Sequence, residues 1–129
     1  MPIYIHSEHP GYTHKKAVKT KDWLESVILA EGQILGEINI IFVGDEELRK
    51  INMKYLKHDY YTDVISFEYS GDNVVSGDIF ISFDQIVYNS NMLGVLKIYE
   101  LHRVMVHGFL HLLGYGDKTK KEKLGHYLD

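Results

Sequence analysis

The stretch HRVMVHGFLHLLGYG, residues 102–116, predicts the central element of the fold. Its apolar side chains spread round most of a helical wheel, and a helix that is apolar on nearly all sides is a buried one. We expect one long helix from about Leu96 to Leu113, which Gly114 ends. The remaining narrow seam carries the polar side chains Glu100, Arg103, His107 and His111.

His107 and His111 lie four residues apart, so their Cβ atoms are about 5–6 Å apart on one side of the helix. Gly108 between them costs about 0.8–1 kcal/mol relative to alanine. We therefore expect another element to approach the backbone closely there. Gly116 allows a sharp reversal, which could bring Asp117 back over the two histidines.

Two imidazoles and a carboxylate leave a divalent cation an open position, which is typical of catalytic zinc. A cation held in this way lowers the pKa of its water to about 7 in favourable cases. Histidines at this spacing also arise by chance, so the spacing alone leaves a structural pair open.

The rest of the chain predicts strands alternating with helices. We expect strands at residues 2–8, 37–43, 62–69 and 74–82, with a turn at 70–73, and further helices at 22–32, 46–56, 83–92 and from 119 onward. Capping boxes are expected to open three of these helices, namely Asp22 with Glu25, Ser82 with Gln85, and Thr119 with Glu122. The predicted fold is an α+β domain spanning residues 1–129, with one mixed β-sheet of about four strands and helices packed on it.

Composition excludes several classes of protein. The 129-residue chain has no cysteine, which excludes disulfides and thiolate metal sites. Its net charge of −4 gives no global attraction to nucleic acid, so any phosphate contact has to be local. The first residues do not form a signal peptide, and no apolar stretch approaches the roughly 20 residues that a membrane helix needs. We expect a cytoplasmic protein.

Three blocks of the chain resemble one known family. His107 to Tyr115 read HGFLHLLGY, similar to the H-G-x-L-H-L-x-G-Y signature of the YbeY-type endoribonucleases of bacterial rRNA maturation. INMKYLKHDYYTDVISF, residues 51–67, and GDIFIS, residues 77–82, are similar to the family's other blocks, in order. The resemblance implies a metal-dependent endoribonuclease that cuts single-stranded RNA in 16S 3′-end processing and ribosome quality control.

This chain departs from the family pattern at two places. The third histidine of the signature falls on Asp117, so the implied ligands of one divalent ion, expected to be zinc, are His107, His111 and Asp117. Such mixed sites also accept iron and other divalent ions. The family's arginine falls on Leu56, which cannot bind a phosphate bidentately. Lys57 or His58 could substitute in part, although lysine lacks the forked pair of donors that arginine offers to a phosphate.

Several further residues have both a functional and a structural interpretation. Ser66 is our candidate catalytic residue, since the family places its strand beside the metal; Thr62 and Asp63 are expected to make strand-entry hydrogen bonds. We expect an ordinary ion pair between Glu100 and Arg103.

The remaining basic and aromatic side chains divide in the same way. The basic run KTKKEK, 118–123, suits phosphate contact. The residues HKK, 14–16, with Lys19 and Lys21, predict a solvated loop, and Tyr60 and Tyr61 predict partly buried aromatics rather than base-stacking ones. No converging partner is expected for the histidines outside the signature, which are His6, His9, His14, His58, His102 and His126.

Three other functions compete with a metal-dependent hydrolase of single-stranded RNA. A metalloprotease would place glutamate where this chain has Gly108. A non-haem iron oxygenase uses two histidines and a carboxylate, but the strand order and helical pair argue against it. A non-catalytic ribosome-assembly factor with a structural metal is the alternative that Leu56 leaves open. Ribosomal or small-subunit proteins are possible partners, and neither DNA nor membrane is expected.

Overall fold

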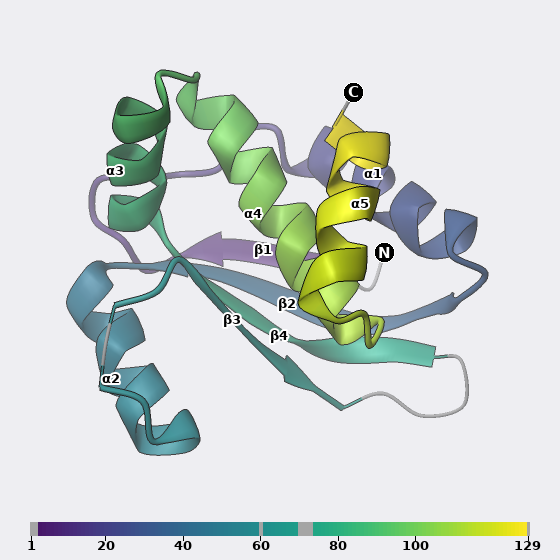
Figure 1. Ribbon diagram of the computed structural model, residues 1–129, viewed down its shortest axis with the longest axis horizontal. Helices are drawn as coiled ribbons and strands as arrows, with labels where there is room; N and C mark the ends of the chain where they lie inside the picture. Colours follow the sequence, from purple (N-terminus) through teal and green to yellow (C-terminus); the bar gives the residue numbers. More distant parts are fainter. Residues whose placement is uncertain (1–2, 60, 70–73, 129) are drawn as a thin grey trace.

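The elements follow one another in the order expected from the sequence, as Figure 1 shows. The computed structural model describes residues 3–59, 61–69 and 74–128, apart from the side chains of Asp117 and His126. In chain order the elements are β1 (Ile3–Ser7), α1 (Ala17–Ala30), β2 (Ile34–Val43), α2 (Asp45–Leu56), β3 (Val64–Glu68), β4 (Val74–Ser82), α3 (Phe83–Leu93), α4 (Lys97–Leu112) and α5 (Asp117–Leu128). The turn expected at 70–73 lies outside the described residues.

The four strands form one mixed sheet in the order β1-β2-β4-β3. β1 and β4 both run parallel to β2, whereas β3 runs antiparallel to β4. The α+β class and the mixed four-stranded sheet are therefore confirmed. No helix within the described ranges has the length and apolar character that a membrane crossing requires.

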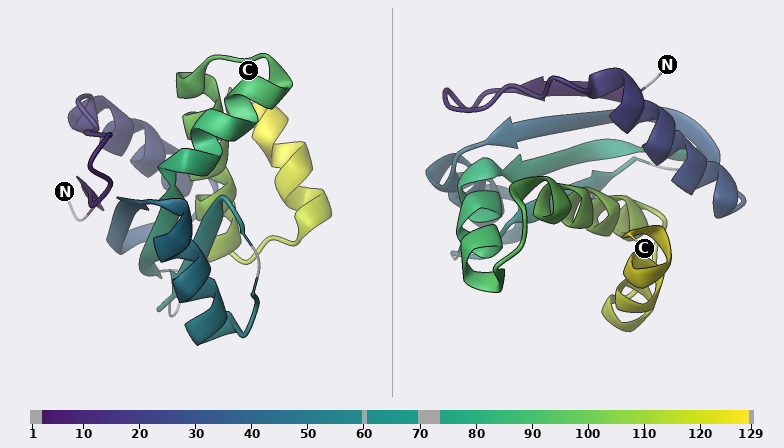
Figure 2. Two further views of the ribbon diagram at one scale, coloured as in Figure 1. Left: turned by 90° about the vertical axis from the view of Figure 1, so that its left-hand side faces the viewer. Right: turned by 90° about the horizontal axis from the view of Figure 1, so that it is seen from above.

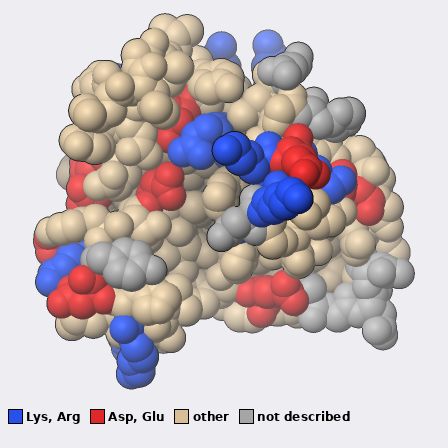
Figure 3. Space-filling model, in the orientation of Figure 1, with Lys and Arg blue, Asp and Glu red and all other residues tan. Residues whose placement is uncertain are grey.

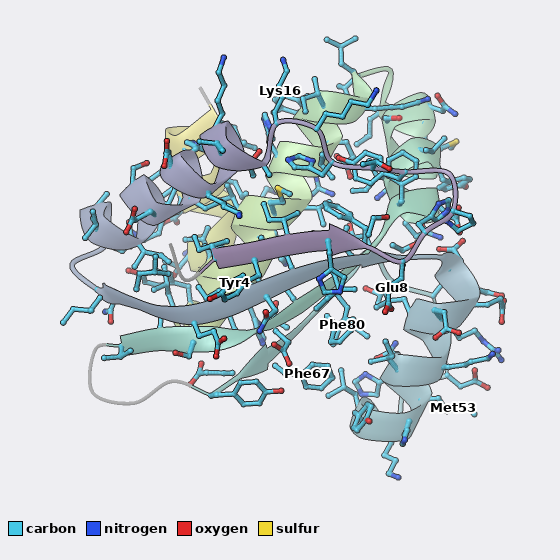
Figure 4. All side chains as sticks on the ribbon, turned by 180° about the vertical axis from the view of Figure 1, so that it is seen from behind. Tyr4, Glu8, Lys16, Met53, Phe67 and Phe80 are labelled. Carbon is cyan, nitrogen blue, oxygen red and sulfur yellow. The ribbon has the colours of Figure 1, made fainter. Side chains whose placement is uncertain are left out.

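Alternating side chains of β2 separate two hydrophobic layers. Ile38, Ile40 and Phe42 are fully buried in the main core, together with residues of α1 and α4. The intervening Ile41 and Val43 pack in a smaller cluster with Leu48 of α2 on the opposite face. Figure 2 shows α4 and α5 on one side of the sheet, and Figure 4 shows Tyr4, Phe67 and Phe80 on the other, where α2 covers only one corner.

Two helix starts differ from the sequence-based prediction. α1 begins at Ala17 rather than Asp22, because Thr20 is already buried and bonded to His14, so the core-facing stripe starts a turn earlier. α5 begins at Asp117 rather than after Thr119, because the Gly116 carbonyl accepts from the Lys120 amide at 2.9 Å.

One of the two hydrogen bonds expected of the Ser82–Gln85 capping box is present. The Ser82 hydroxyl accepts from the Gln85 amide at 3.2 Å, but the Gln85 side chain bonds to Asp45 at 3.3 Å instead of returning to the cap. The N-termini of α2 and α3 are thereby joined.

Candidate active site

Helix α4 presents the two histidines as the sequence predicts. Nine of its residues are buried, Leu101, Val106 and Phe109 among them, whereas His107 is half-buried and His111 is exposed. The helix ends in a Schellman motif, since Gly114 has a φ of 89° and its amide donates to the His111 carbonyl. The Tyr115 amide donates to the Leu110 carbonyl, which completes the motif. The chain therefore turns directly after the second histidine.

Gly108 is the point where α4 lies closest to the sheet. A Cβ atom there would stand 3.0 Å from Ile79 Cγ2, 3.2 Å from Val64 Cγ2 and 3.3 Å from Ser66 Oγ. The predicted close approach is confirmed, and the neighbours belong to the paired strands β3 and β4. The glycine thus allows the helix to hold both histidines next to the start of β3.

A pocket of about 330 Å³ opens between α2, β3, α4 and α5. Both His107 and His111 line it, which confirms that they face one space. The other side chains around it include Asn52 and Leu56 of α2, His58 and Thr62 of the following loop, Val64 and Ser66 of β3, and Lys120 of α5. This size is at the lower end of the range for small-ligand sites.

Ser66 lines the pocket, and its hydroxyl group already donates a hydrogen bond. Its hydroxyl donates to the Gly108 carbonyl at 3.2 Å, joining β3 to the middle of α4. The hydroxyl oxygen still has acceptor capacity toward the pocket. Ser66 therefore fixes the strand to the helix, and its catalytic role stays a prediction.

The polar seam of α4 forms the expected ion pair above the histidines. Arg103 binds the fully buried carboxylate of Glu100 through two hydrogen bonds of 2.7 Å. It also reaches Asp63 at 3.4 Å, so the start of β3 is tied to α4. The hydrogen bonds to Glu100 raise the pKa of Arg103 further above its ordinary value, against the effect of burial. This network positions the strand entry beside His107.

The proposed third ligand lies outside the described side chains. The backbone of Asp117 begins α5, but its side chain is not described, and the described residues contain no cluster of three histidine or acidic side chains that could hold a metal. The ligand set His107, His111 and Asp117 therefore stays a prediction. Lys120, one turn further along α5, lines the pocket.

Helix α5 is fastened over this region through one carboxylate. Glu31, at the end of α1, has a side chain that is 8% exposed, and it accepts from the Tyr115 and Tyr127 hydroxyls. Lys123 Nζ lies 2.9 Å from Glu31 Oε1. Burial raises the pKa of Glu31, but the hydrogen bonds from the two tyrosines and Lys123 outweigh it and hold the pKa below its ordinary value.

Comparison with known proteins identifies the family. Residues 7–125 match the family described as Endoribonuclease YbeY. The chain belongs to the YbeY endoribonuclease family. Endoribonuclease YbeY of Bacteroides thetaiotaomicron is 45% identical over 84% of this chain and 79% of that protein. Endoribonuclease YbeY of Flavobacterium johnsoniae is 50% identical over 76% of this chain and 70% of that protein. The solution structure of a Thermotoga maritima protein aligns with a TM-score of 0.68 at 29% identity, covering 98% of this chain and 86% of that one.

Two residues at and just after the end of α2 complete the pocket wall. Leu56, where the resemblance implies an arginine, lines the pocket and is 41% exposed. His58 lines it as well, which corrects the expectation that this histidine has no converging partner. Sequence spacing could not predict this, because His58 and the signature histidines are far apart in the chain and line the same pocket only in the folded protein.

Two lysines of the basic run 118–123 make defined contacts in the fold. Lys120 is buried and lines the pocket, and Lys123 binds Glu31. These two lysines are therefore held by the fold, and only Lys120 lines the pocket, as phosphate contact would require. Figure 3 shows lysine or arginine side chains gathered over α5 on this face of the YbeY-family domain.

The aromatic side chains before β3 do not line the pocket where they are described. Tyr61 is 52% exposed, so about half of it is buried; its hydroxyl donates to Glu46, and Arg49 Cζ lies 5.7 Å from its ring centre. Tyr60 lies outside the described residues.

Proposed function

We propose that this chain is a metal-dependent endoribonuclease that cuts single-stranded RNA during maturation of the 16S 3′ end and ribosome quality control. The observation that carries the proposal is that His107 and His111 of the family signature line one pocket with the Leu56 position and Lys120. The name endoribonuclease on the relatives favours an enzyme over a non-catalytic assembly factor. We assign the activity to one domain over residues 1–129, working in the cytoplasm.

The residues around the pocket suit one divalent ion, for which we propose zinc. Imidazole nitrogen and carboxylate oxygen are normal zinc ligands, and we assign them to His107, His111 and Asp117. Residue 117 lies one helical turn before Lys120, which lines the pocket, so the two positions share one face of α5. The bound ion would supply Lewis-acid activation of water and of the phosphate.

The remaining side chains would bind and orient the RNA. Lys120 brings a positive charge to the pocket, which suits a phosphate of the strand. His58 offers a further nitrogen, whereas Leu56 offers only apolar surface. The Ser66 oxygen can accept a hydrogen bond from water or from a ribose hydroxyl while its own hydroxyl group donates to the Gly108 carbonyl. Ribosomal proteins of the small subunit are the proposed partners.

RNA cleavage by the loaded protein tests the proposal. Purified untagged protein with zinc is incubated with a 5′-labelled single-stranded RNA and with the matching duplex, beside Asp117→Ala. We expect cleavage of the single strand by the parent protein and its loss in the variant. Identical product patterns from the parent and the variant would indicate a contaminating nuclease and overturn the proposal.

A further inference from the structure

A second, larger pocket lies away from the signature histidines. Its volume is about 670 Å³, and it is bordered by the loop before α1, the first turns of α1 and α4, and the end of α5. His102 of α4 lines it, five residues before His107. Five residues correspond to about 140° of rotation at about 100° per residue, so the two pockets lie on different sides of the helix.

Aromatic rings form the walls of this second pocket. Trp23 and Tyr99 both line it, and Tyr99 is 43% exposed. The Trp23 indole packs against the His102 imidazole with ring centres 4.8 Å apart, which holds the indole in place. The described lining contains no carboxylate and no carboxamide. Such a pocket offers flat surfaces for stacking and few groups that could read the edge of a base.

Lysines stand around the mouth of the pocket without acidic partners in its lining. Lys15, Lys16 and Lys19 all line it and are exposed, and the first turn of α1 carries no acidic residue. Figure 4 places Lys16 at the turn that leads into α1. On a chain with a net charge of −4, this is a local concentration of positive charge. Its charge complements a phosphate chain.

The loop that carries these lysines is held by its other side chains. Tyr12 stacks on Phe83 with ring centres 4.3 Å apart and bonds to His14, whose Nε2 lies 2.8 Å from the Thr20 hydroxyl. Burial, and then the nearby His102, lower the pKa of His14. The loop is therefore ordered before any ligand binds, which reduces the entropy cost of binding.

We propose that this second pocket binds one nucleotide of single-stranded RNA, with the base against Trp23 and Tyr99 and the flanking phosphates on Lys15, Lys16 and Lys19. The choice of RNA rests on the proposed function. Stacking with lysine–phosphate contact is the sequence-tolerant mode of binding single strands. Helix α5 borders both pockets, with Lys120 in one and Tyr127 in the other, about 10 Å apart along the helix. At about 3.4 Å or more per nucleotide step, a strand needs at least about four nucleotides to reach both.

Trp23 is the single tryptophan of the chain, so its fluorescence reports this pocket directly. As-purified full-length protein is titrated in low salt with a six-nucleotide oligoadenylate, whose integrity is checked on a gel. We expect saturable quenching that weakens with added salt. In Lys16→Gln/Lys19→Gln the affinity should fall roughly tenfold, and the slope of log K against log salt should shrink by about 0.7 for each lost contact.

A matched control removes two lysines from another surface. Lys50 and Lys54 lie on α2 and are exposed, and neither lines the second pocket. The variant Lys50→Gln/Lys54→Gln should bind the oligonucleotide within about twofold of the parent affinity, because Lys50 and Lys54 lie away from the proposed phosphate contacts at Lys15, Lys16 and Lys19. Equal weakening by both double variants would overturn the proposal, and so would the absence of saturable quenching. Adenosine monophosphate that binds as tightly as the oligonucleotide would assign the pocket to free nucleotides and overturn the RNA assignment. Cleavage is not the readout, so failure of the parent to cut RNA counts against the proposed function alone.

Discussion

Replacing Gly108 by alanine tests the close contact between α4 and the sheet. The new methyl group would stand 3.0 Å from Ile79 Cγ2 and 3.2 Å from Val64 Cγ2, both on strands that cannot move independently of the sheet. Overpacking of this kind costs about 1–3 kcal/mol. Displacement of α4 also stretches the 3.2 Å bond between Ser66 and the Gly108 carbonyl, which contributes about 0.5–1.5 kcal/mol.

Alanine recovers part of this loss through helix propensity, about 0.8–1 kcal/mol. The expected net effect of Gly108→Ala is a decrease of about 2 kcal/mol in the free energy of unfolding, the sum of these three contributions. For a domain of this size the melting temperature should fall by about 6–8 °C. Urea unfolding followed by circular dichroism measures the first quantity, and a thermal scan measures the second.

Gly125 of α5 provides the matched control. It is helical and exposed, and a Cβ atom there meets nothing within 4 Å. Gly125→Ala should therefore stabilise the protein by up to about 1 kcal/mol through propensity alone. If Gly108→Ala gains as much stability as Gly125→Ala, the packing argument is refuted.

Three further predictions concern the groups around the site. Glu31→Gln should lower the free energy of unfolding by about 2 kcal/mol at pH 7. Hydrogen bonds lower the folded-state pKa of Glu31, so its contribution to stability is full above the unfolded pKa of about 4.3 and is lost as the pH falls through the folded-state pKa. Urea titrations of both proteins measure this, and a stability difference between parent and variant that persists at pH 2 would contradict it. Arg103→Met should cost about 3–5 kcal/mol by leaving the buried Glu100 carboxylate unpaired, and adding Glu100→Gln should recover part of the loss in the same assay. Leu56→Arg should raise the initial rate of RNA cleavage several-fold and Leu56→Lys less, because only arginine binds a phosphate bidentately; equal rates in all three proteins would show that this position does not contact the substrate.

The sequence predicted the elements whose signal is local and periodic. The helix at 96–113 and the strand at 37–43 are both present within a few residues, since a continuous apolar run marks each one. The close approach at Gly108 was also predictable, because a glycine in the middle of such a helix needs a packing reason.

What the sequence did not predict depends on contacts between distant segments. The start of α1 was placed too late, because Thr20 is buried by a bond to His14 in the preceding loop. The place of His58 beside the signature histidines follows from the packing of α2 against the start of β3, and the second pocket forms only where α1, α4 and α5 meet. No periodic pattern carries that information.

Metal content per chain tests the central claim most directly. Elemental analysis of the untagged protein, the Asp117→Ala variant and the Asp117→His variant compares three ligand sets at the same position. We predict one divalent ion per chain in the parent, loss of that ion in Asp117→Ala, and retention in Asp117→His, since imidazole and carboxylate are both zinc ligands. Full occupancy in Asp117→Ala would contradict the account.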